Sequence, residues 1–410
     1  MPGCPVFDLT APETYSGGMP RDVFKYLRNE QPIYWHEDPA QQRGFWAVTR
    51  HSDLDFISKN PLLFSSEAET CFLHEQDPDM MVMMRLLMIN MDPPMHIKYR
   101  RLVRNAFTPK AVDSYEQRFR SIAKDILDQA VMGGRCEFVQ DVAAELPLIA
   151  ICELMGVPLD KRGRLFELTN IMIGMDDPEL ATTQEEGTMA MMEVFMLAQE
   201  LAAEQRTNPR EDIVNVLLNG TVEDEPLTDD EFCYFFLLLI VAGNETTRTV
   251  TSHGMRLLME HGQYQQLADN PELLEGAIEE FLRYNPAVIA FRRTAMEDVE
   301  VGGQLIKKGD KIQMYYGAAS ADEMLFADSD RFDITRAQRE ELRNNHRAFG
   351  IGEHFCLGSH LARLELKVIF EEILRRIRNP RFDGEISWLR SNFINGIKSM
   401  PISFDVIERS

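Results

Sequence analysis

One cysteine of the chain stands in a setting that favours chemistry at its sulfur. Cys356 lies in the segment FGIGEHFCLG, residues 349–358, and is followed by an amphipathic pattern that predicts a helix from Ser359. A cysteine just before a helix N-terminus meets unpaired backbone N–H groups and the positive end of the helix dipole, and both favour a thiolate. The sequence predicts a metal-binding or reactive sulfur here, with a buried, inert cysteine as the common alternative.

Three glycines of the same segment favour a loop that lies against a flat ligand. Gly350, Gly352 and Gly358 can adopt backbone angles that other residues avoid, and they let the main chain approach a ligand closely. A zinc site built on His354 and Cys356 is a second interpretation. We rank it low because no other cysteine lies near these two residues in sequence.

A long helix is predicted to cross the molecule beside this loop. Thr228 and Glu231 form a capping box ahead of an apolar run, and no proline interrupts the pattern before Gly262. About 34 residues at 1.5 Å each give a rod near 50 Å long. The first half is apolar on every face, so the helix should run through the interior. A polar cluster in its middle then needs an explanation.

The rest of the chain predicts a mainly α fold with minor β structure. Apolar residues recur three and four apart from about residue 53 to residue 259, which favours helices. No internal repeat or linker divides the chain, so we expect a single unit over residues 1–410, with an irregular N-terminal segment over 1–20. Alternating aromatic and β-branched residues predict strands at 33–36, 44–49 and within 299–316.

Composition and charge exclude several classes of function. The 410 residues carry 43 Lys and Arg against 66 Asp and Glu, and the resulting net charge of −23 would repel a nucleic acid. The six cysteines have no paired spacing, which argues against a disulfide framework. The longest apolar run is shorter than the about 20 residues that span a bilayer, and the N-terminus lacks a secretory pattern. We expect a cytoplasmic monomer without a membrane span.

The cysteine loop resembles the haem-binding signature of the cytochrome P450 family. Residues 349–358 match F-G-x-G-x-H-x-C-x-G at every specified position. The resemblance implies that Cys356 is the thiolate ligand of the iron of haem b, and that Phe349 and Gly350 lie against the porphyrin. A thiolate ligand favours O–O cleavage. The resemblance therefore implies the P450 fold, with a long central helix over haem and small sheets, and a monooxygenase activity.

The middle of the long helix is similar to the family's A/G-G-x-D/E-T segment for oxygen activation. Ala242 and Gly243 stand at its first two positions, and Glu245 and Thr246 at its last two. The resemblance implies that Gly243 weakens the helix and leaves room for dioxygen and a water beside the iron, and that Ala242 and Gly243 adjoin the cofactor. It also implies that Thr246 and Glu245 deliver protons. Ordinary packing of small polar residues is the alternative, but an acid on an interior helix favours a function.

Two further sets of residues match the family. Glu280 and Arg283 fit E-x-x-R, a spacing that by itself is common on solvated helix faces. The resemblance implies that Arg336 joins them in a buried ionic triad that holds the cysteine loop. Partners of the haem propionates are implied at His96, Arg100, Arg293 and His354.

The resemblance implies a hydrophobic small molecule as substrate, such as a terpenoid, a steroid or a branched lipid. Methionines crowd residues 80–95 and 172–196, which would roof the substrate pocket, and methionine adapts to bulky apolar ligands. Each methionine could equally fill a gap in the core. Apolar residues also match pocket-lining positions of the family at Val288, Ile289, Phe393 and Ile394.

A stretch without acids suggests how electrons arrive. Residues 96–110 carry five cations and no Asp or Glu, on a chain of strongly negative net charge. They predict a docking face for an acidic ferredoxin, with a solvated helix face as the alternative. No flavin-binding or nicotinamide-binding domain is present, so a ferredoxin reductase would pass on electrons from NAD(P)H. The five cations are Lys98, Arg100, Arg101, Arg104 and Lys110.

Two other functions stay open at this point. One is a haem-binding sensor or carrier that never turns over, against which the Glu245–Thr246 pair and the cationic stretch argue. The other is a P450-type enzyme with peroxide-driven, isomerising or oxidative coupling chemistry.

Overall fold

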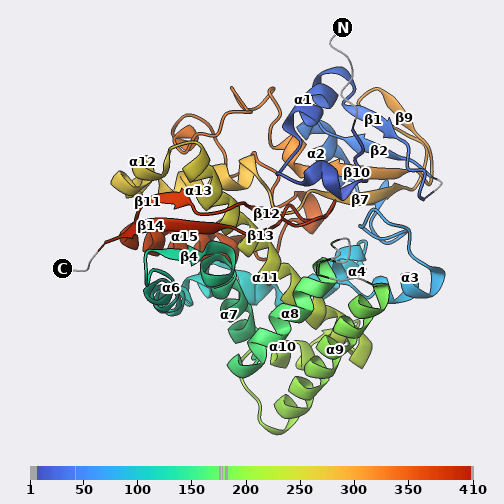
Figure 1. Cartoon of the computed structure of the whole chain (residues 1–410). Helices are drawn as coiled ribbons and strands as arrows, with labels where there is room; N and C mark the ends of the chain where they lie inside the picture. Colours follow the sequence, from blue (N-terminus) through green and yellow to red (C-terminus); the bar gives the residue numbers. More distant parts are fainter. Residues whose placement is uncertain (1–6, 42, 175–176, 178, 181–182, 408–410) are drawn as a thin grey trace.

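The fold is mainly helical with small sheets, as the sequence predicted. A computed structural model describes residues 7–41, 43–174, 177, 179–180 and 183–407. In Figure 1 the helices fill the centre and the lower part of the molecule, and the largest sheet lies at the upper right. Residues 7–20 hold one short 3-10 helix, and residues 1–6 of the predicted irregular segment lie outside the described residues.

The elements have the following bounds. The α-helices are α1 (Arg21–Glu30), α2 (His51–Lys59), α3 (Pro78–Met84), α4 (Met95–Val103), α5 (Pro109–Asp113), α6 (Glu116–Ala130), α7 (Glu145–Leu154), α8 (Arg162–Ile173), α9 (Gln184–Thr207), α10 (Ile213–Asn219), α11 (Asp229–Glu260), α12 (Tyr264–Asp269), α13 (Leu274–Tyr284), α14 (Tyr316–Ala319) and α15 (Ser359–Arg376). The strands are β1 (Ile33–His36), β2 (Phe45–Val48), β3 (Phe64–Ser65), β4 (Arg135–Glu137), β5 (Thr221–Val222), β6 (Glu225–Pro226), β7 (Ala290–Ala295), β8 (Val299–Val301), β9 (Gln304–Ile306), β10 (Lys311–Tyr315), β11 (Ile377–Phe382), β12 (Ser387–Trp388), β13 (Ile397–Ser399) and β14 (Pro401–Val406). The short turns are η1 (Pro12–Tyr15), η2 (Met88–Asn90), η3 (Arg104–Phe107), η4 (Val139–Ala143, a π-helix), η5 (Leu159–Lys161), η6 (Pro271–Leu273), η7 (Arg336–Gln338) and η8 (Gly352–His354).

The largest sheet joins the two strand-rich segments that the sequence predicted. Its order is β1-β2-β10-β7-β3, in which β2 and β10 are parallel and the other pairs are antiparallel. The register sets Ile312 of β10 opposite Arg293 of β7. The strands β7 and β11 to β14 were not predicted, nor were the short strands β3, β4, β5 and β6 within the segment predicted as helical. Strands of two or three residues are too short to show a period.

Helix α11 begins and ends close to the predicted positions. Both hydrogen bonds of the capping box form, and the Glu231 N–H donates to Thr228 Oγ1 over 3.2 Å. The helix spans 32 residues and stops two residues before Gly262, whose φ of +65° ends it in a left-handed turn. Its apolar half is buried, including Phe235, Phe236 and Ile240, so it runs through the interior as predicted.

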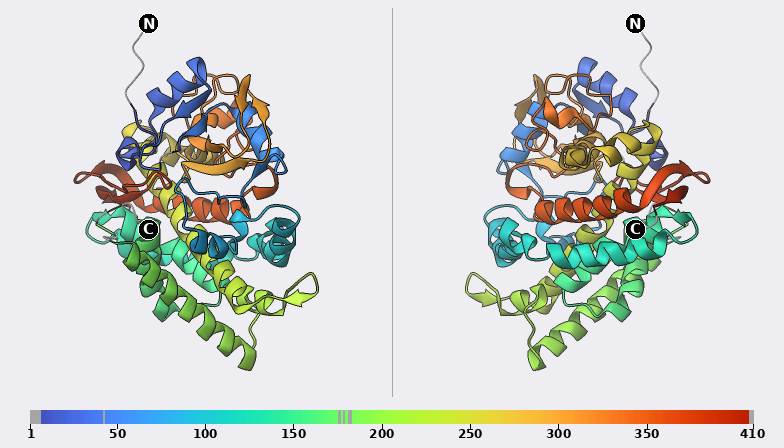
Figure 2. Two further views of the ribbon diagram at one scale, coloured as in Figure 1. Left: turned by 90° about the vertical axis from the view of Figure 1, so that its right-hand side faces the viewer. Right: turned by 90° about the vertical axis from the view of Figure 1, so that its left-hand side faces the viewer.

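Helix α15 crosses α11 near the centre of the molecule. Figure 2 shows the two helices crossing, with α15 close to horizontal in both views. Leu366, Val368 and Phe370 of α15 are fully buried. The cysteine loop leads directly into α15, so the sulfur is set beside the middle of α11.

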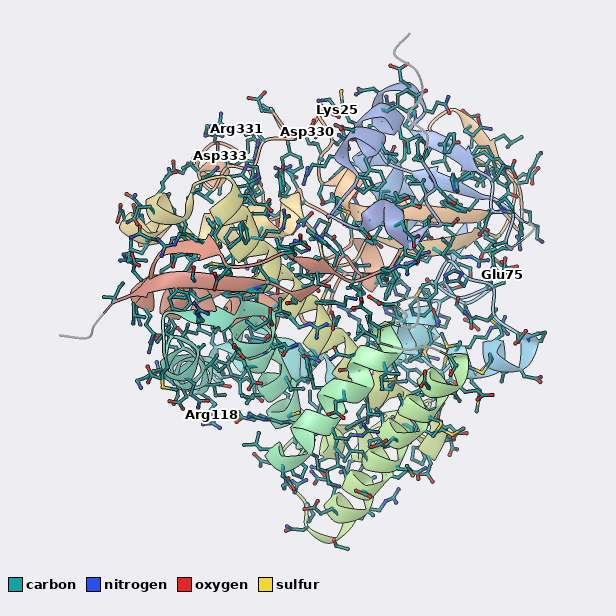
Figure 3. All side chains as sticks on the ribbon, in the orientation of Figure 1. Lys25, Glu75, Arg118, Asp330, Arg331 and Asp333 are labelled. Carbon is teal, nitrogen blue, oxygen red and sulfur yellow. The ribbon has the colours of Figure 1, made fainter. Side chains whose placement is uncertain are left out.

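A long irregular segment between α14 and the cysteine loop is tied to the first helix. Lys25 Nζ on α1 lies 2.6 Å from Asp330 Oδ2, and both residues are labelled in Figure 3. Arg28 on α1 forms a two-pronged ion pair with Glu323 at 2.8 and 2.9 Å. Within the described ranges, no helix is long and apolar enough to span a bilayer.

Candidate active site

A large cavity lies between α11 and the cysteine loop. It encloses about 1560 Å³ of space without protein atoms, counting its open mouth. Its lining includes Ala242, Gly243 and Thr246 from α11 and Phe349, Gly350 and Cys356 from the loop. Most of its lining is apolar and a few polar groups converge on it, which is typical of a site for a small molecule or a prosthetic group.

The cysteine loop is fixed by backbone hydrogen bonds and two left-handed glycines. Cys356 N–H donates to the carbonyl of Phe349 over 2.9 Å. Gly350 and Gly352 have φ of +66° and +75°, and a Cβ on Gly352 would stand 2.5 Å from the carbonyl oxygen of Ser58. Only glycine fits there, as the sequence analysis expected. The same expectation is wrong for Gly358, whose φ of −85° suits any residue.

Burial and the nearby cations shift the pKa of the Cys356 thiol in opposite directions. Burial raises the pKa of its thiol, although the Gly358 N–H and the charges of Arg100 and Arg363 act in the opposite direction. Burial therefore acts against the thiolate that the helix N-terminus favours. A bound metal ion deprotonates a thiol outright. The sulfur is thus suited to a metal ligand rather than to a free nucleophile.

Four residues predicted to bind carboxylates gather on one side of the cavity. His96, Arg100, Arg293 and His354 all line it. The rings of His96 and His354 are stacked with centroids 4.0 Å apart, and Arg100 Nη2 donates to the Phe355 carbonyl over 2.6 Å. Residues from α4, β7 and the cysteine loop, far apart in sequence, therefore form one cluster.

This cluster lacks an anion. Burial and the neighbouring arginines lower the pKa of His96 to about 4 and that of His354 well below its ordinary value, so both rings are neutral. Among the described residues, neither Arg100 nor Arg293 forms an ion pair, and His96 Nδ1 has no hydrogen-bond partner. Buried cations are normally paired. A flat group with two carboxylates above Cys356, such as haem, fits the cluster.

Thr246 and Ala242 face the cavity from α11. The Thr246 hydroxyl donates to the Ala242 carbonyl over 2.8 Å. The helix is continuous through Gly243, so the expected weakening of the helix is not seen. A Cβ on Gly243 would stand 3.0 Å from Ile151 Cδ1. The glycine therefore lets α7 pack closely against α11, in addition to any room it leaves in the cavity.

Glu245 points to the other side of α11. Its side chain is 1% exposed and is ion-paired with Arg248, one turn along the helix. Arg248 Nη1 donates to Asn170 Oδ1 on α8 over 2.7 Å, and its guanidinium carbon lies 5.4 Å from the centroid of the Phe166 ring. Of the described residues that line the cavity, Thr246 and Thr247 are members but Glu245 is not. The acid is thus held between α11 and α8.

A second buried acid, which the sequence analysis missed, does line the cavity. Glu365 of α15 is 2% exposed, and its Oε2 has no hydrogen-bond partner among the described residues. Burial raises its pKa to about 8, and a hydrogen bond from the Thr247 side chain counters this only in part. Glu365 therefore carries a proton at neutral pH. Its place four residues after Leu361, on the apolar stripe of α15, was the signal that could have identified it.

The three residues predicted as an ionic triad are in contact. Arg283 Nε and Nη2 donate to the Glu280 carboxylate over 2.7 and 2.8 Å, and Arg336 Nε donates to it over 3.3 Å. All three side chains are at most 1% exposed. Arg283 also donates to the Ser320 carbonyl, while Ser320 Oγ accepts from the N–H of Arg347 just before the cysteine loop. Ser320 thus connects the triad to that loop.

The apolar residues predicted to line the pocket divide into two groups. Val288 lines the cavity. Ile289, Phe393 and Ile394 are not among the lining residues. The Ile289 N–H donates to the Phe393 carbonyl over 2.9 Å, and Ile394 pairs with Val288 in a β-bridge. They support the wall of the cavity.

The prediction that the methionines form the roof of the pocket is wrong for α9. The side chains of Met189, Met192 and Met196 are 69%, 57% and 58% exposed, on the outer face of the helix. Met88 lines the cavity, and no other methionine of the described residues does. Met175 lies outside the described residues. The spacing of these methionines did not reveal which face of α9 is turned to solvent.

Comparisons with known proteins agree on one family. The family model named Cytochrome P450 matches residues 161–380. Linalool 8-monooxygenase of Pseudomonas putida is 36% identical over 403 residues, covering 96% of this chain and 98% of that protein. Steroid C26-monooxygenase of Rhodococcus jostii is 37% identical over 407 residues, covering 97% of this chain and 84% of that protein.

Solved structures give the same picture. Cytochrome P450 CYP268A2 of Mycobacterium marinum, in complex with pseudoionone, superimposes with a TM-score of 0.88. It is 34% identical in sequence, and the match covers 98% of this chain and 100% of that chain. CYP109E1 of Bacillus megaterium, in complex with testosterone, has a TM-score of 0.84 at 30% identity, covering 97% of this chain and 100% of that chain.

Proposed function

The chain belongs to the cytochrome P450 family of haem monooxygenases, and from this premise we propose that it hydroxylates a neutral hydrophobic small molecule with electrons from a ferredoxin. The observation that carries the substrate class is the lining of the cavity. Its cations are gathered in the His96–Arg100–Arg293–His354 cluster, and most of the remaining lining is apolar, including Leu238, Val250 and Phe291. A terpenoid, a steroid or a branched lipid fits such a surface.

This chain offers residues for both the iron and the propionates of a haem. Haem b, when bound, supplies the iron at which dioxygen is activated, and its thiolate ligand favours O–O cleavage. Cys356 supplies that sulfur. Arg100 and Arg293 offer two charges for the two propionates, and neutral His96 and His354 offer hydrogen bonds. Phe349 and Gly350 line the cavity on the side of Cys356 and would pack against the group.

The proton supply has two candidate sources. Thr246 presents its hydroxyl to the cavity and can exchange the Ala242 carbonyl for a ligand as hydrogen-bond partner. Glu245, the acid that the family motif points to, must leave Arg248 before it can serve. Glu365 already holds a proton beside Thr247. We assign Thr246 the hydrogen bond to the reacting oxygen, Glu245 the entry of protons from the outer side, and Glu365 a proton store within the cavity.

Glu365→Gln is expected to remove a pH-dependent loss of stability. The folded-state pKa of about 8 lies above the ordinary value of 4.5 for a glutamate, so the folded protein binds the proton more tightly than the unfolded chain does. Wild-type stability then falls as pH rises from about 4.5 to about 8, by roughly 5 kcal/mol in total. The free energy of unfolding, measured by urea titration at pH 5 and pH 9, should depend less on pH in the variant.

The matched control for this prediction is Glu297→Gln, at an exposed position between β7 and β8. It should leave the pH dependence of wild type unchanged. Parallel stability profiles for Glu365→Gln and wild type would show that Glu365 is charged at neutral pH, and the proton store would be withdrawn.

The names of the relatives support the proposed substrate class. One acts on linalool and another on a steroid, and a further relative, 34% identical over 393 residues, is a methyl-branched lipid omega-hydroxylase. These substrates share a large apolar surface. The shared chemistry matches the lining of the cavity in this chain.

A binding screen tests the substrate class. Terpenoid alcohols, sterols and branched alkanols should shift the haem spectrum from low to high spin, and turnover with NADH, reductase and ferredoxin should add one oxygen atom to the bound compound. Matched fatty acids should bind at least tenfold more weakly, because a carboxylate would lose its hydration without gaining a cation. Equal affinity for an acid and its matching alcohol would contradict the neutral-substrate proposal. Binding without turnover would favour a sensor or carrier.

The predicted docking face for the ferredoxin is smaller than the sequence suggested. Lys98 is ion-paired with Glu223, and Arg100 is directed to the cavity lining. Arg101, Arg104 and Lys110 are exposed, and none of them forms an ion pair with a described residue. Arg100 reaches the carbonyl next to Cys356 from the same segment. These three cations, which we term the donor patch, therefore lie on the elements that adjoin the cysteine loop.

Arg104→Glu is expected to raise the apparent KM for ferredoxin by about tenfold and to weaken the dependence of KM on salt. Opposite charges across an interface speed association, and the effect is screened by salt. The measurement is steady-state turnover over a series of salt concentrations. The control Lys308→Glu makes the same charge change outside the donor patch and should leave KM unchanged. Equal kinetics for the two variants would exclude this patch as the docking site.

A further inference from the structure

A charged network beside the cysteine loop joins Glu279, Arg363 and His346. Glu279 of α13 accepts from Arg363 Nε and Nη2 over 2.6 and 2.9 Å. The same carboxylate is 2.9 Å from His346 Nε2. The side chains of Glu279, Arg363 and His346 are 11%, 13% and 1% exposed. The network is therefore shielded from solvent. In such surroundings, charges act over longer distances than they do in water.

The charges of the network can be assigned from its hydrogen bonds. The N–H of Ala348 donates to His346 Nδ1 over 3.2 Å, so this nitrogen is the acceptor and Nε2 carries the proton given to Glu279. Burial lowers the pKa of His346, which keeps the ring neutral. The cation of Arg363 then faces the single anion of Glu279. The net charge of the network is zero.

Arg363 also contacts the loop that carries the sulfur. Its guanidinium carbon lies 4.6 Å from the centroid of the Phe349 ring, within the range of a cation–π interaction. Phe349 in turn accepts the N–H of Cys356 at its carbonyl over 2.9 Å and lines the cavity. The Arg363 cation therefore lies over the Phe349 ring, and its counter-ion is the Glu279 carboxylate.

We propose that Arg363 is a positioning residue that seats the Phe349 ring beside Cys356, and that Glu279 neutralises Arg363 so that the network adds no net charge to the haem–thiolate centre. The inference rests on the proposed role of Cys356 as the haem ligand. Reduction of the ferric centre adds one electron and no compensating cation. A net positive charge nearby would favour the reduced state, and a net negative charge would disfavour it. The balance between Glu279 and Arg363 thus sets the reduction potential.

Two single variants of the holoenzyme should move the potential in opposite directions. Glu279→Gln leaves Arg363 uncompensated and should favour reduction at least threefold, which is about 28 mV upward at 59 mV per tenfold change. Arg363→Met leaves the Glu279 carboxylate and should lower the potential by a similar amount. The double variant restores zero net charge and should return close to wild type. The measurement is a dithionite titration at pH 8, where His346 stays neutral.

Shifts of the same sign in both single variants, or no shift in either, would overturn the inference, since a loop that is merely loosened has no reason to respond to the sign of the charge. If Glu279→Gln fails to take up haem, the reduction potential of Arg363→Lys tests the inference instead. It keeps the cation and should stay close to the wild-type potential, whereas Arg363→Met should not. Equal shifts for these two would also overturn the inference. The reduced, CO-bound spectrum of the wild-type protein tests the role of Cys356 separately from that of the network. Without the red-shifted Soret band, Cys356 would not be the haem ligand.

Discussion

Cys356→Ser should lose the red-shifted Soret band of the reduced, CO-bound protein and should lose turnover by roughly a thousandfold or more, the scale on which an essential group acts. A serine hydroxyl is a far weaker electron donor to iron than a thiolate, and the push that favours O–O cleavage goes with it. The cationic cluster of Arg100 and Arg293 is untouched by this change. The variant should therefore still take up haem, with an altered spectrum.

Cys136→Ser provides the control. Cys136 is a second cysteine that is not fully buried, on β4, and it does not line the cavity. Its replacement should leave the spectrum and the turnover unchanged. A red-shifted band in Cys356→Ser, or the loss of that band in Cys136→Ser, would refute the ligand assignment.

Glu280→Gln should lower the free energy of unfolding by about 3–5 kcal/mol, because it leaves two buried guanidinium groups without their shared anion. Arg283 and Arg336 are at most 1% exposed and cannot turn to water for compensation. The loss should extend to haem content, since Ser320 joins the triad to the segment that leads into the cysteine loop. Urea denaturation and the haem-to-protein absorbance ratio measure the two effects.

A glutamate on the same helix serves as the reference for this variant. Glu275 is 77% exposed and lies 3.0 Å from Lys367 in a surface ion pair. Glu275→Gln should cost less than about 1 kcal/mol and leave the haem content unchanged. Losses of similar size in the two variants would mean that burial does not strengthen the triad, and its assigned role would have to be abandoned.

The features that the sequence predicted well are those set by local spacing. The capping box of Thr228 and Glu231 depends on residues three apart, and both of its hydrogen bonds form. The glycines at positions 350 and 352 have the left-handed angles that the loop demands. The antiparallel pair β1 and β2 follows from alternating residues in two adjacent segments. Such patterns specify a local shape irrespective of what packs against it.

The features that the sequence did not predict depend on which way a helix face is turned. Glu365 looks like one of three similar acids on α15 until α11 and the loop enclose it. Arg248 stands three residues after Glu245, the same spacing as in Glu280 and Arg283, yet only the second pair was recognised as an ion pair. Met189, Met192 and Met196 of α9 have side chains suited to a pocket lining but face solvent. Packing between distant segments decides all three cases.

The contact between Arg248 and Asn170 has a consequence for exchanging parts between relatives. Asn170 and Phe166 belong to α8, whereas Arg248 and Glu245 belong to α11. Grafting α8 and α9 from a relative is a route to a new substrate range. It would also replace Asn170 and Phe166, the α8 residues that contact Arg248, the ion-pair partner of Glu245. A chimaera that keeps Asn170 and Phe166 should retain the wild-type setting of Glu245, and one that replaces them would change substrate preference and proton supply in a single step.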